Sequence, residues 1–291
     1  MDIIAQNIVS GVMVGALYGL AALGLSLVFG VLKVLNVAHG ELIMIGGYTT
    51  FWLFNLYGID PLVSLVIVIP TLFLIGMLLH WGLFSRVVQL DEENRIKNSL
   101  LIGFGLTLVL QSLAIQLWTA DERSVTPTYA TAAFEIFGIR FPVVRLAGLV
   151  VAFLSVAALE IFLNRSYWGK AIRATAEDWQ TAALTGINIK STYLFTFGLG
   201  ASLAGIAGTL VTMSFSISPF IGLQWTLKAL IVVVLAGLGS IGGVIAAGIL
   251  LGVTEALSAY AFGGQYRELV GLILFLIVLS FRPQGLFGGK G

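Results

Sequence analysis

The sequence contains no cysteine, and this absence excludes disulfide bonds and thiolate metal sites. It has only two histidines, His39 and His80, and no H-E-x-x-H motif, so we expect no metal centre. No G-x-x-x-x-G-K-[ST] motif occurs either, which means that the chain has no P-loop with which to bind ATP. Because a cysteine nucleophile and a recognisable catalytic triad are also missing, the sequence predicts a protein that is not an enzyme and has no cofactor.

Charged residues are scarce as well, at 10% of the chain against about 25% in soluble domains. Apolar residues make up 58% of the chain, and the mean hydropathy is +1.03. A soluble protein could not hide that much apolar surface, because its exterior must contact water, whereas a lipid bilayer accepts an apolar exterior. The composition therefore predicts an all-α, polytopic bundle of transmembrane helices that forms one domain over residues 1–291. The net charge of +1 argues against nucleic acid as a partner and leaves membrane lipid as the expected one.

Apolar stretches long enough to form transmembrane helices, about 20 residues each, recur along the chain. We expect about eight membrane segments, near residues 8–32, 41–57, 62–84, 98–118, 143–163, 192–214, 226–261 and 268–281. The 226–261 stretch is too long for one span, and Gly237, Gly239 and Gly242 interrupt it. We interpret it as two short helices joined by a glycine turn, which either span twice or form a re-entrant hairpin. Because non-helical backbone within a membrane must be surrounded by protein or water, the turn is a candidate for a transport path.

The distribution of lysine and arginine predicts the orientation of the bundle. An N-terminus outside the cell leaves only five of the fifteen basic residues in outer segments, namely Arg123, Arg140, Arg145, Lys228 and Arg267. The opposite orientation would invert this ratio, although cytoplasmic loops normally carry the excess of positive charge. We therefore expect the N-terminus outside and the C-terminus in the cytoplasm. We also expect the first apolar stretch to be a retained helix, since residues 1–4 lack the basic start of a signal peptide.

Glycines recur at four-residue spacing in two of the apolar stretches. Gly11, Gly15 and Gly19 share one helix face, and Gly248 and Gly252 repeat the spacing. Such patterns allow the backbones of two membrane helices to approach closely. We favour packing within this chain over association with a second subunit.

Polar residues interrupt the apolar run between the first two segments, where Asn36, His39 and Glu41 occur close together. One interpretation places them at the cytoplasmic interface, because burial in lipid would be costly; Asn36 would then cap the next helix and Glu41 would complement its dipole. The other interpretation assigns them to the transport path or to a partner. Glu255 is the only credible acid for a proton-coupled carrier, but we favour a capping or pairing role near the outer surface.

Residues 164–191 form the longest strongly polar stretch. Residues 170–184 are rich in alanine and amphipathic, and Gly186 follows at the position of a C-terminal cap, which predicts one short helix. One face of that helix would carry Ile172, Ala176, Trp179 and Ala183. The helix is either an ordinary interfacial helix or a docking helix for a soluble partner.

Four segments together resemble the smaller permease of bacterial branched-chain amino acid ABC importers. They are residues 36–42 with 46–48, residues 173–187, residues 228–243 and residues 281–288, which occur in the expected order across nearly the whole chain. The resemblance implies an assembly in the bacterial inner membrane with a paralogous second permease, two cytoplasmic ABC ATPase subunits and an extracytoplasmic substrate-binding protein. It also implies an ATPase-docking loop at 164–191 that includes Arg173, Ala174, Glu177, Asp178, Ala182, Gly186 and Ile187.

The match to the docking pattern of permeases in general, E-A-A-x-x-x-G, is partial, because the corresponding positions are Gln180, Thr181 and Ala182, followed by Gly186. We expect a second set of residues to line the transport path or to flex beside it: Asn36, His39, Glu41, Gly237, Gly239, Gly242 and Glu255. Two alternative functions stay open, a permease for urea or short amides of the same family and a stand-alone ion-coupled carrier.

Overall fold

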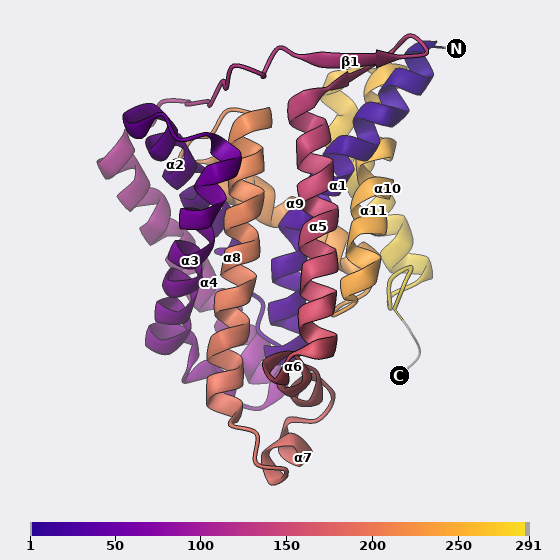
Figure 1. Cartoon of the computed structure of the whole chain (residues 1–291). Helices are drawn as coiled ribbons and strands as arrows, with labels where there is room; N and C mark the ends of the chain where they lie inside the picture. Colours follow the sequence, from indigo (N-terminus) through magenta and orange to yellow (C-terminus); the bar gives the residue numbers. More distant parts are fainter. Residues whose placement is uncertain (1, 289–291) are drawn as a thin grey trace.

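Long helices make up most of the computed structural model, which describes residues 2–288 (Figure 1). They are α1 (Asp2–Leu32), α2 (His39–Tyr57), α3 (Pro61–Leu79), α4 (Glu92–Trp118), α5 (Val143–Arg165), α8 (Ile189–Ser214), α9 (Ile221–Ala236), α10 (Ile241–Phe262) and α11 (Arg267–Phe281). Within this part of the chain, seven helical segments are long and apolar enough to cross a membrane, and α9 is a shorter apolar helix. The prediction of an all-α, polytopic bundle is confirmed.

Short elements mark the two ends of the bundle. At one end, β1 (Ala133–Ile136) and β2 (Ile139–Pro142) form an antiparallel hairpin that the sequence analysis did not predict. Its turn has positive φ at Phe137 and Gly138, as in the two-residue turns that suit the twist of hairpins. At the other end lie α6 (Tyr167–Glu177) and α7 (Trp179–Leu184). We call these the hairpin end and the foot end.

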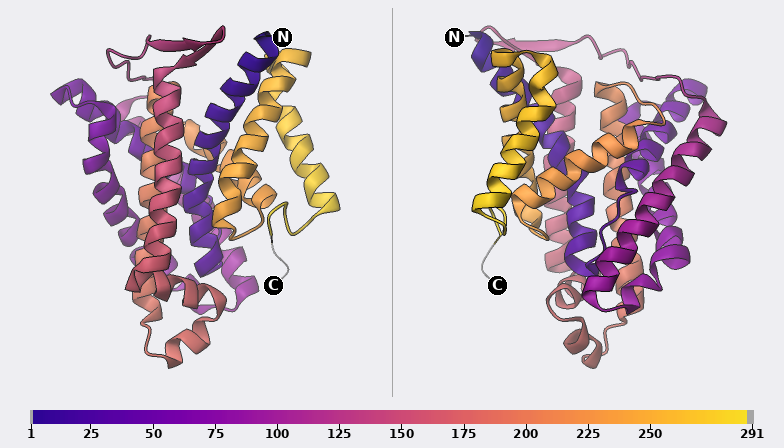
Figure 2. Two further views of the ribbon diagram at one scale, coloured as in Figure 1. Left: turned by 45° about the vertical axis from the view of Figure 1, so that its right-hand side comes forward. Right: turned by 180° about the vertical axis from the view of Figure 1, so that it is seen from behind.

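The first described residues lie at the hairpin end, and the last described residues lie toward the foot end (Figures 1 and 2). Opposite ends for the two termini are what the predicted orientation requires, although the orientation itself depends on the membrane and stays a prediction. The helix α1 lies at the centre of the bundle, since 94% of the residues in its most apolar 18-residue segment are buried. In the span that contains α11, the corresponding share is 11%. The outer helices α3, α4 and α11 expose apolar side chains, as a surface in contact with lipid requires.

Glycines allow α1 and α10 to pack backbone against backbone. A Cβ atom at Gly15 would lie 2.5 Å from the carbonyl oxygen of Gly248, and one at Gly252 would lie 2.4 Å from the carbonyl oxygen of Gly11. Both distances are too short for any side chain to fit without movement of the helices. The small-residue faces therefore pack within this chain, as we favoured from the spacing.

Replacement of Gly15 by alanine is expected to lower the free energy of unfolding by about 1–3 kcal/mol, because the added methyl group pushes two backbones apart. Gly105→Ala in α4 is the matched control, because no atom lies within 4 Å of a Cβ built at that position. Alanine there should be neutral or stabilise by up to about 1 kcal/mol, as its helix propensity predicts. Thermal unfolding of the purified protein in detergent measures both variants, and equal stabilities would show that the close packing has no energetic importance.

The predicted glycine turn joins α9 to α10 at the foot end. Gly237 and Gly239 have φ values of +97° and +88°, in the region that favours glycine. The segment after α11 folds over this turn, and the backbone N–H of Leu286 donates to the carbonyl oxygen of Leu235 at 2.8 Å. The tail thus satisfies a carbonyl group that the end of α9 would otherwise leave unpaired.

The two helices joined by this turn differ in length. The helix α9 has 16 residues and runs obliquely, whereas α10 has 22 residues and is long enough for a complete span (Figure 2). The prediction of two short helices is therefore wrong for α10, because its apolar sequence continues through Glu255 to Phe262 without a break.

Candidate functional site

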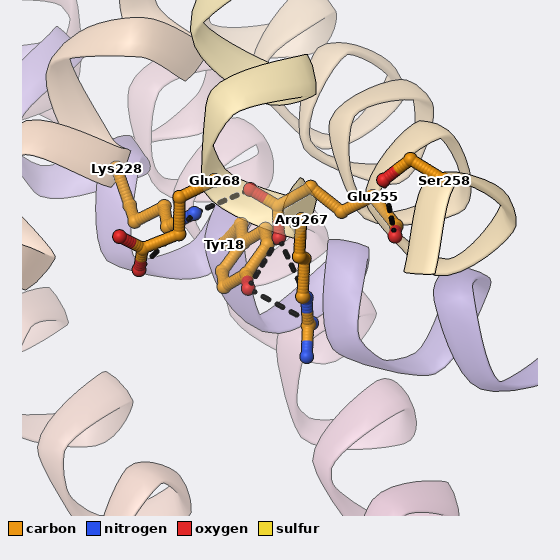
Figure 3. Close-up of polar contacts among 6 residues, drawn as sticks. All are labelled: Tyr18, Lys228, Glu255, Ser258, Arg267 and Glu268. Carbon is orange, nitrogen blue, oxygen red and sulfur yellow. Dashed lines mark hydrogen bonds and ion pairs between the residues drawn. The ribbon is translucent and has the colours of Figure 1, made fainter. Parts of the chain in front are cut away.

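A buried cluster of charged side chains lies where α1, α9, α10 and α11 meet (Figure 3). Glu255 is completely buried and forms an ion pair with Lys228 through one carboxylate oxygen. Arg267 donates from Nε to the other oxygen at 3.0 Å, and the hydroxyl of Tyr18 donates to the same oxygen at 2.9 Å. Arg267 also donates from Nη2 to the hydroxyl of Tyr18 at 3.1 Å. Two cations and a hydroxyl thus compensate a carboxylate that would be very costly to bury alone.

A tight reversal of the chain after α10 positions this cluster. Gly263 has a φ of +100°, and the 3-10 turn Gly264–Tyr266 follows it. Arg267 is the first residue of α11, so the reversal returns its guanidinium group to Glu255 on α10. Of the two roles predicted for Glu255, capping and pairing, the structure shows pairing. Tyr18 was not predicted from the sequence, and Lys228 was expected only as an outer charge, although a lysine within an apolar helix indicates that a buried acid lies nearby.

A cavity of about 470 Å³ adjoins the cluster, and we call it the charged cavity. Its volume falls in the range of small-molecule sites, about 300–1,000 Å³. Its polar wall contains Tyr18, Lys228, Arg267, Glu122 and Glu268, and its apolar wall contains Phe215, Phe220, Ile221 and Trp225. A larger groove of about 730 Å³ lies near the foot end around His80 and Trp179. We regard the charged cavity as the better candidate site, because buried charges beside an apolar wall can fix the orientation of a ligand.

The segment between α1 and α2 enters the bundle instead of lying at its surface. Lys33 has a φ of +53°, and Asn36 and His39 are almost completely buried. The Nε2 atom of His39 lies 2.9 Å from the carbonyl oxygen of Ala21, in the middle of α1. Asn36 accepts from the backbone N–H of Ala38 at 3.1 Å, and α2 begins without a side-chain cap. The interfacial interpretation and the capping role of Asn36 are therefore wrong, because this asparagine closes its own turn.

Glu41 lies in the first turn of α2, as predicted, but inside the bundle. Its exposed fraction is 1%, and its Oε2 atom has no hydrogen-bond partner among the described residues. Its carboxylate touches α9, since a Cβ atom at Gly222 would lie 2.1 Å from Oε1. The hydroxyl of Thr226 accepts from the N–H of Gly40 and donates to the carbonyl of Val37, both at 2.8 Å. The N-terminal ends of α2 and α9 therefore meet around one buried acid.

Glu41→Gln is expected to raise the free energy of unfolding by about 1–3 kcal/mol. The amide keeps the shape of the side chain, while it removes a charge whose burial without a hydrogen bond exceeds the gain from the helix dipole. Glu135→Gln, at an exposed position of β1, is the control and should change stability by less than about 0.5 kcal/mol. Thermal unfolding in detergent tests the prediction, and a destabilised Glu41→Gln protein would contradict it.

The predicted path residues fall into separate groups. Gly239 lies at the foot end, where it lines a cavity of about 360 Å³ together with Arg173 and Glu177 of α6. Gly237 belongs to the same turn, and Gly242 lies in the first turn of α10. Glu255 lies further along α10, in the charged cluster, and the residues of the α1–α2 break form a third group between α2 and α9. The glycine turn therefore lies near the docking candidates Arg173 and Glu177 and not near Glu255.

The polar stretch 164–191 forms two helices, so the prediction of one continuous helix is wrong. Asp178 separates them, with φ −152° and ψ 102°. Its carboxylate accepts from the backbone N–H of Gln180 at 2.9 Å and from the hydroxyl of Thr181, which begins α7 afresh. The hydrogen bonds from Thr181 and Gln180 hold the pKa of Asp178 below its ordinary value. The predicted common face is also broken, because Ile172 is buried whereas Trp179 is exposed.

The remaining docking candidates surround this break. Gly186 has a φ of +89° and donates its N–H to the carbonyl of Ala183 at 3.1 Å, so its predicted place at the helix end is confirmed. Ala182 is buried and accepts from the N–H of Ile187 at 3.3 Å. On α6 lie Arg173, Ala174 and Glu177. Leu184, which no sequence pattern singles out, is 88% exposed at the foot end.

Together, the apolar helices, the charged cavity between them and the short helical foot define a polytopic membrane protein of the permease class. Residues 7–279 match the family described as "Branched-chain amino acid transport system / permease component". The chain belongs to this family and is a transport subunit rather than an enzyme.

Curated relatives agree with this assignment. The chain is 35% identical to the high-affinity branched-chain amino acid transport system permease protein BraD of Pseudomonas aeruginosa, over 97% of this chain and 95% of BraD. It is 31% identical to the corresponding protein LivH of Escherichia coli, over the same shares of the two chains. The probable branched-chain amino acid transport permease protein LivH of Methanocaldococcus jannaschii is 28% identical, over 92% of this chain and 88% of that protein.

Proposed function

We propose that this chain is the translocation subunit of an ATP-driven importer of branched-chain amino acids in a bacterial cytoplasmic membrane. The names of the relatives BraD and LivH support the substrate class. Because the sequence has no P-loop, we assign the energy supply to two cytoplasmic ATPase subunits. A substrate-binding protein would deliver the amino acid from outside. A paralogous permease would complete the membrane part. This pairing is supported by the similarity of this chain to the probable branched-chain amino acid transport permease protein LivM of Methanocaldococcus jannaschii, with 26% identity over 86% of this chain.

The observation that carries this proposal is the foot, formed by α6 and α7. It projects from the bundle at the end opposite to the hairpin (Figure 1). Leu184 and Trp179 expose apolar surface there, and such surface is typical of sites that contact another protein. We therefore assign the 164–191 segment to ATPase docking, with the foot end in the cytoplasm and the hairpin end and N-terminus outside.

The docking candidates adjoin the glycine turn, which gives the proposed coupling a physical route. Arg173 and Glu177 share the 360 Å³ cavity with Gly239, so a displacement of α6 would act on the turn between α9 and α10. ATP can shift the populations of inward-open and outward-open states only by binding more tightly to one of them. We propose that the turn at residues 237–243 and the break at residues 33–40 absorb this change of state, and that His39 and Glu41 contribute to the path.

Uptake by the complete importer tests the function. Proteoliposomes that contain this permease, its paralogue and both ATPase subunits receive the binding protein, with radiolabelled leucine or urea in parallel. The expected result is leucine uptake that requires internal ATP and little uptake of urea. Preferred uptake of urea would assign the chain to amide transport, and uptake by the purified chain alone under a proton gradient would identify an ion-coupled carrier.

A further inference from the structure

The two cations of the charged cluster retain hydrogen-bonding capacity beyond their contacts with Glu255. The ammonium group of Lys228 has three N–H donors, and Glu255 is its only hydrogen-bond partner within residues 2–288. Arg267 uses Nε for Glu255 and Nη2 for Tyr18, while its Nη1 makes no hydrogen bond in the same part of the chain. Both side chains line the charged cavity, so these donors are available to a ligand there.

The cluster of Glu255, Lys228 and Arg267 carries a net positive charge. Glu255 carries one negative charge against the two positive charges of Lys228 and Arg267, and the Tyr18 hydroxyl is neutral. The two cations are only partly accessible to water, because the side chains of Lys228 and Arg267 are 15% and 34% exposed. An anionic group that enters the cavity would therefore meet two cations at close range, where charge-assisted hydrogen bonds are strong.

Two acidic side chains, Glu268 and Glu122, also line the polar wall of the charged cavity. Glu268 lies next to Arg267 in sequence, and its carboxylate forms a long ion pair with Lys228, 4.0 Å from Nζ, which is too long for a hydrogen bond. Its side chain is 77% exposed and so contributes little to the stability of the bundle. Glu122 also lines the cavity and accepts from the hydroxyl of Ser216 at 2.8 Å. The cavity thus presents carboxylate oxygens that can accept from a cation beside N–H groups that can donate to an anion.

An apolar surface faces these charges. Trp225 packs edge-on against Tyr18, with ring centroids 5.7 Å apart, and Phe215 contacts Trp225 in the same manner at 6.1 Å. Phe220 and Ile221 extend this surface along the cavity. A ligand that satisfied every part of the wall would carry one negative group, one positive group and an apolar branch.

We infer that the charged cavity is a binding site for the zwitterionic amino acid within the membrane. Lys228 and Arg267 bind its carboxylate, Glu268 binds its ammonium group, and the aromatic wall contacts its side chain. This inference rests on the proposed function, because it names the residues with which that function recognises its substrate. An uncharged amide would leave both kinds of charge unpaired, and the site therefore selects against it.

Competition binding to the complete importer in nanodiscs, without ATP and without the binding protein, tests this assignment. Radiolabelled leucine is displaced by unlabelled leucine, by 4-methylpentanoate, which lacks the ammonium group, or by 3-methylbutylamine, which lacks the carboxylate. We expect Glu268→Gln to weaken leucine binding about three- to fivefold, as loss of an exposed ion pair does, and to let 4-methylpentanoate compete as well as leucine. Lys228→Met should weaken the binding of leucine and of 4-methylpentanoate, but not that of 3-methylbutylamine. The matched control for Glu268→Gln is Glu135→Gln, because Glu135 is another exposed acid outside the cavity.

The outcomes separate the site from the function. Leucine affinity within twofold of wild type in both Glu268→Gln and Lys228→Met would overturn the site, even if the wild-type importer takes up leucine. Binding with the expected pattern but no ATP-driven uptake would support the site and contradict the proposed function. If Lys228→Met fails to fold, Glu268→Gln decides alone, since this exposed side chain has no role in packing. An equal loss in Glu135→Gln would also overturn the assignment.

Discussion

Leu184→Asp is expected to abolish most ATP-driven uptake while the permease itself stays folded. Leu184 is 88% exposed in α7, so a charge at this position should change the free energy of unfolding by less than about 0.5 kcal/mol. If α7 inserts into a groove of the ATPase, the aspartate must be desolvated there without a partner. Such a change at the centre of an interface costs about 2 kcal/mol or more, which corresponds to a loss of affinity of more than about tenfold. Co-purification of the ATPase on the tagged permease and leucine uptake measure the effect.

The matched control is Phe137→Asp, which places the same charge at an apolar position of similar exposure, 96%, at the hairpin end. This variant should retain the ATPase subunits during purification, because the hairpin lies at the opposite end from the foot (Figure 1). Normal ATPase recovery with Leu184→Asp, or its loss with Phe137→Asp, would show that the docking surface has been assigned to the wrong end of the molecule.

The helical architecture was predictable because it depends on average properties of long segments. A mean hydropathy of +1.03 predicts a bundle of helices in a lipid bilayer, because so much apolar surface could not be buried in water. The four-residue spacing of Gly11, Gly15 and Gly19 identifies the face of α1 that packs against α10. The glycine turn after α9 could be located for a similar reason, since positive φ is expected where glycines cluster in an otherwise apolar run.

The candidate site was less predictable because it depends on contacts between distant segments. Glu255 stood out as an isolated acid, but its partners Tyr18, Lys228 and Arg267 come from three other helices, and no local pattern connects them. Asn36 and His39 likewise lie inside the bundle because the chain turns inward at Lys33. Lys33 has a positive φ, and a turn at a residue other than glycine could not be predicted from the sequence. At Asp178, the predicted helix is interrupted because the aspartate side chain accepts hydrogen bonds from backbone N–H groups.

Removal of the buried acid tests how far the charged cluster is needed for stability. Glu255→Gln is expected to lower the free energy of unfolding by about 3 kcal/mol, because it leaves the partly buried Lys228 and Arg267 without the buried carboxylate that pairs with both. Glu160→Gln is the control, since this acid lies exposed on α5 and forms no ion pair among the described residues. Its stability should stay within about 0.5 kcal/mol of wild type. Thermal unfolding in detergent compares the two variants.

The triple variant Glu255→Leu, Lys228→Met and Arg267→Met separates the structural role of the cluster from its role in recognition. Apolar side chains of similar volume remove all the desolvated charges together, so stability should return to within about 1 kcal/mol of wild type or exceed it. Leucine binding and uptake should nevertheless stay at least tenfold below wild type, because the carboxylate would have lost both of its partners. A triple variant that recovers both stability and transport would mean that these charges only hold α9, α10 and α11 together. Recovered stability without transport would mean that the bundle retains costly buried charges because the substrate needs them.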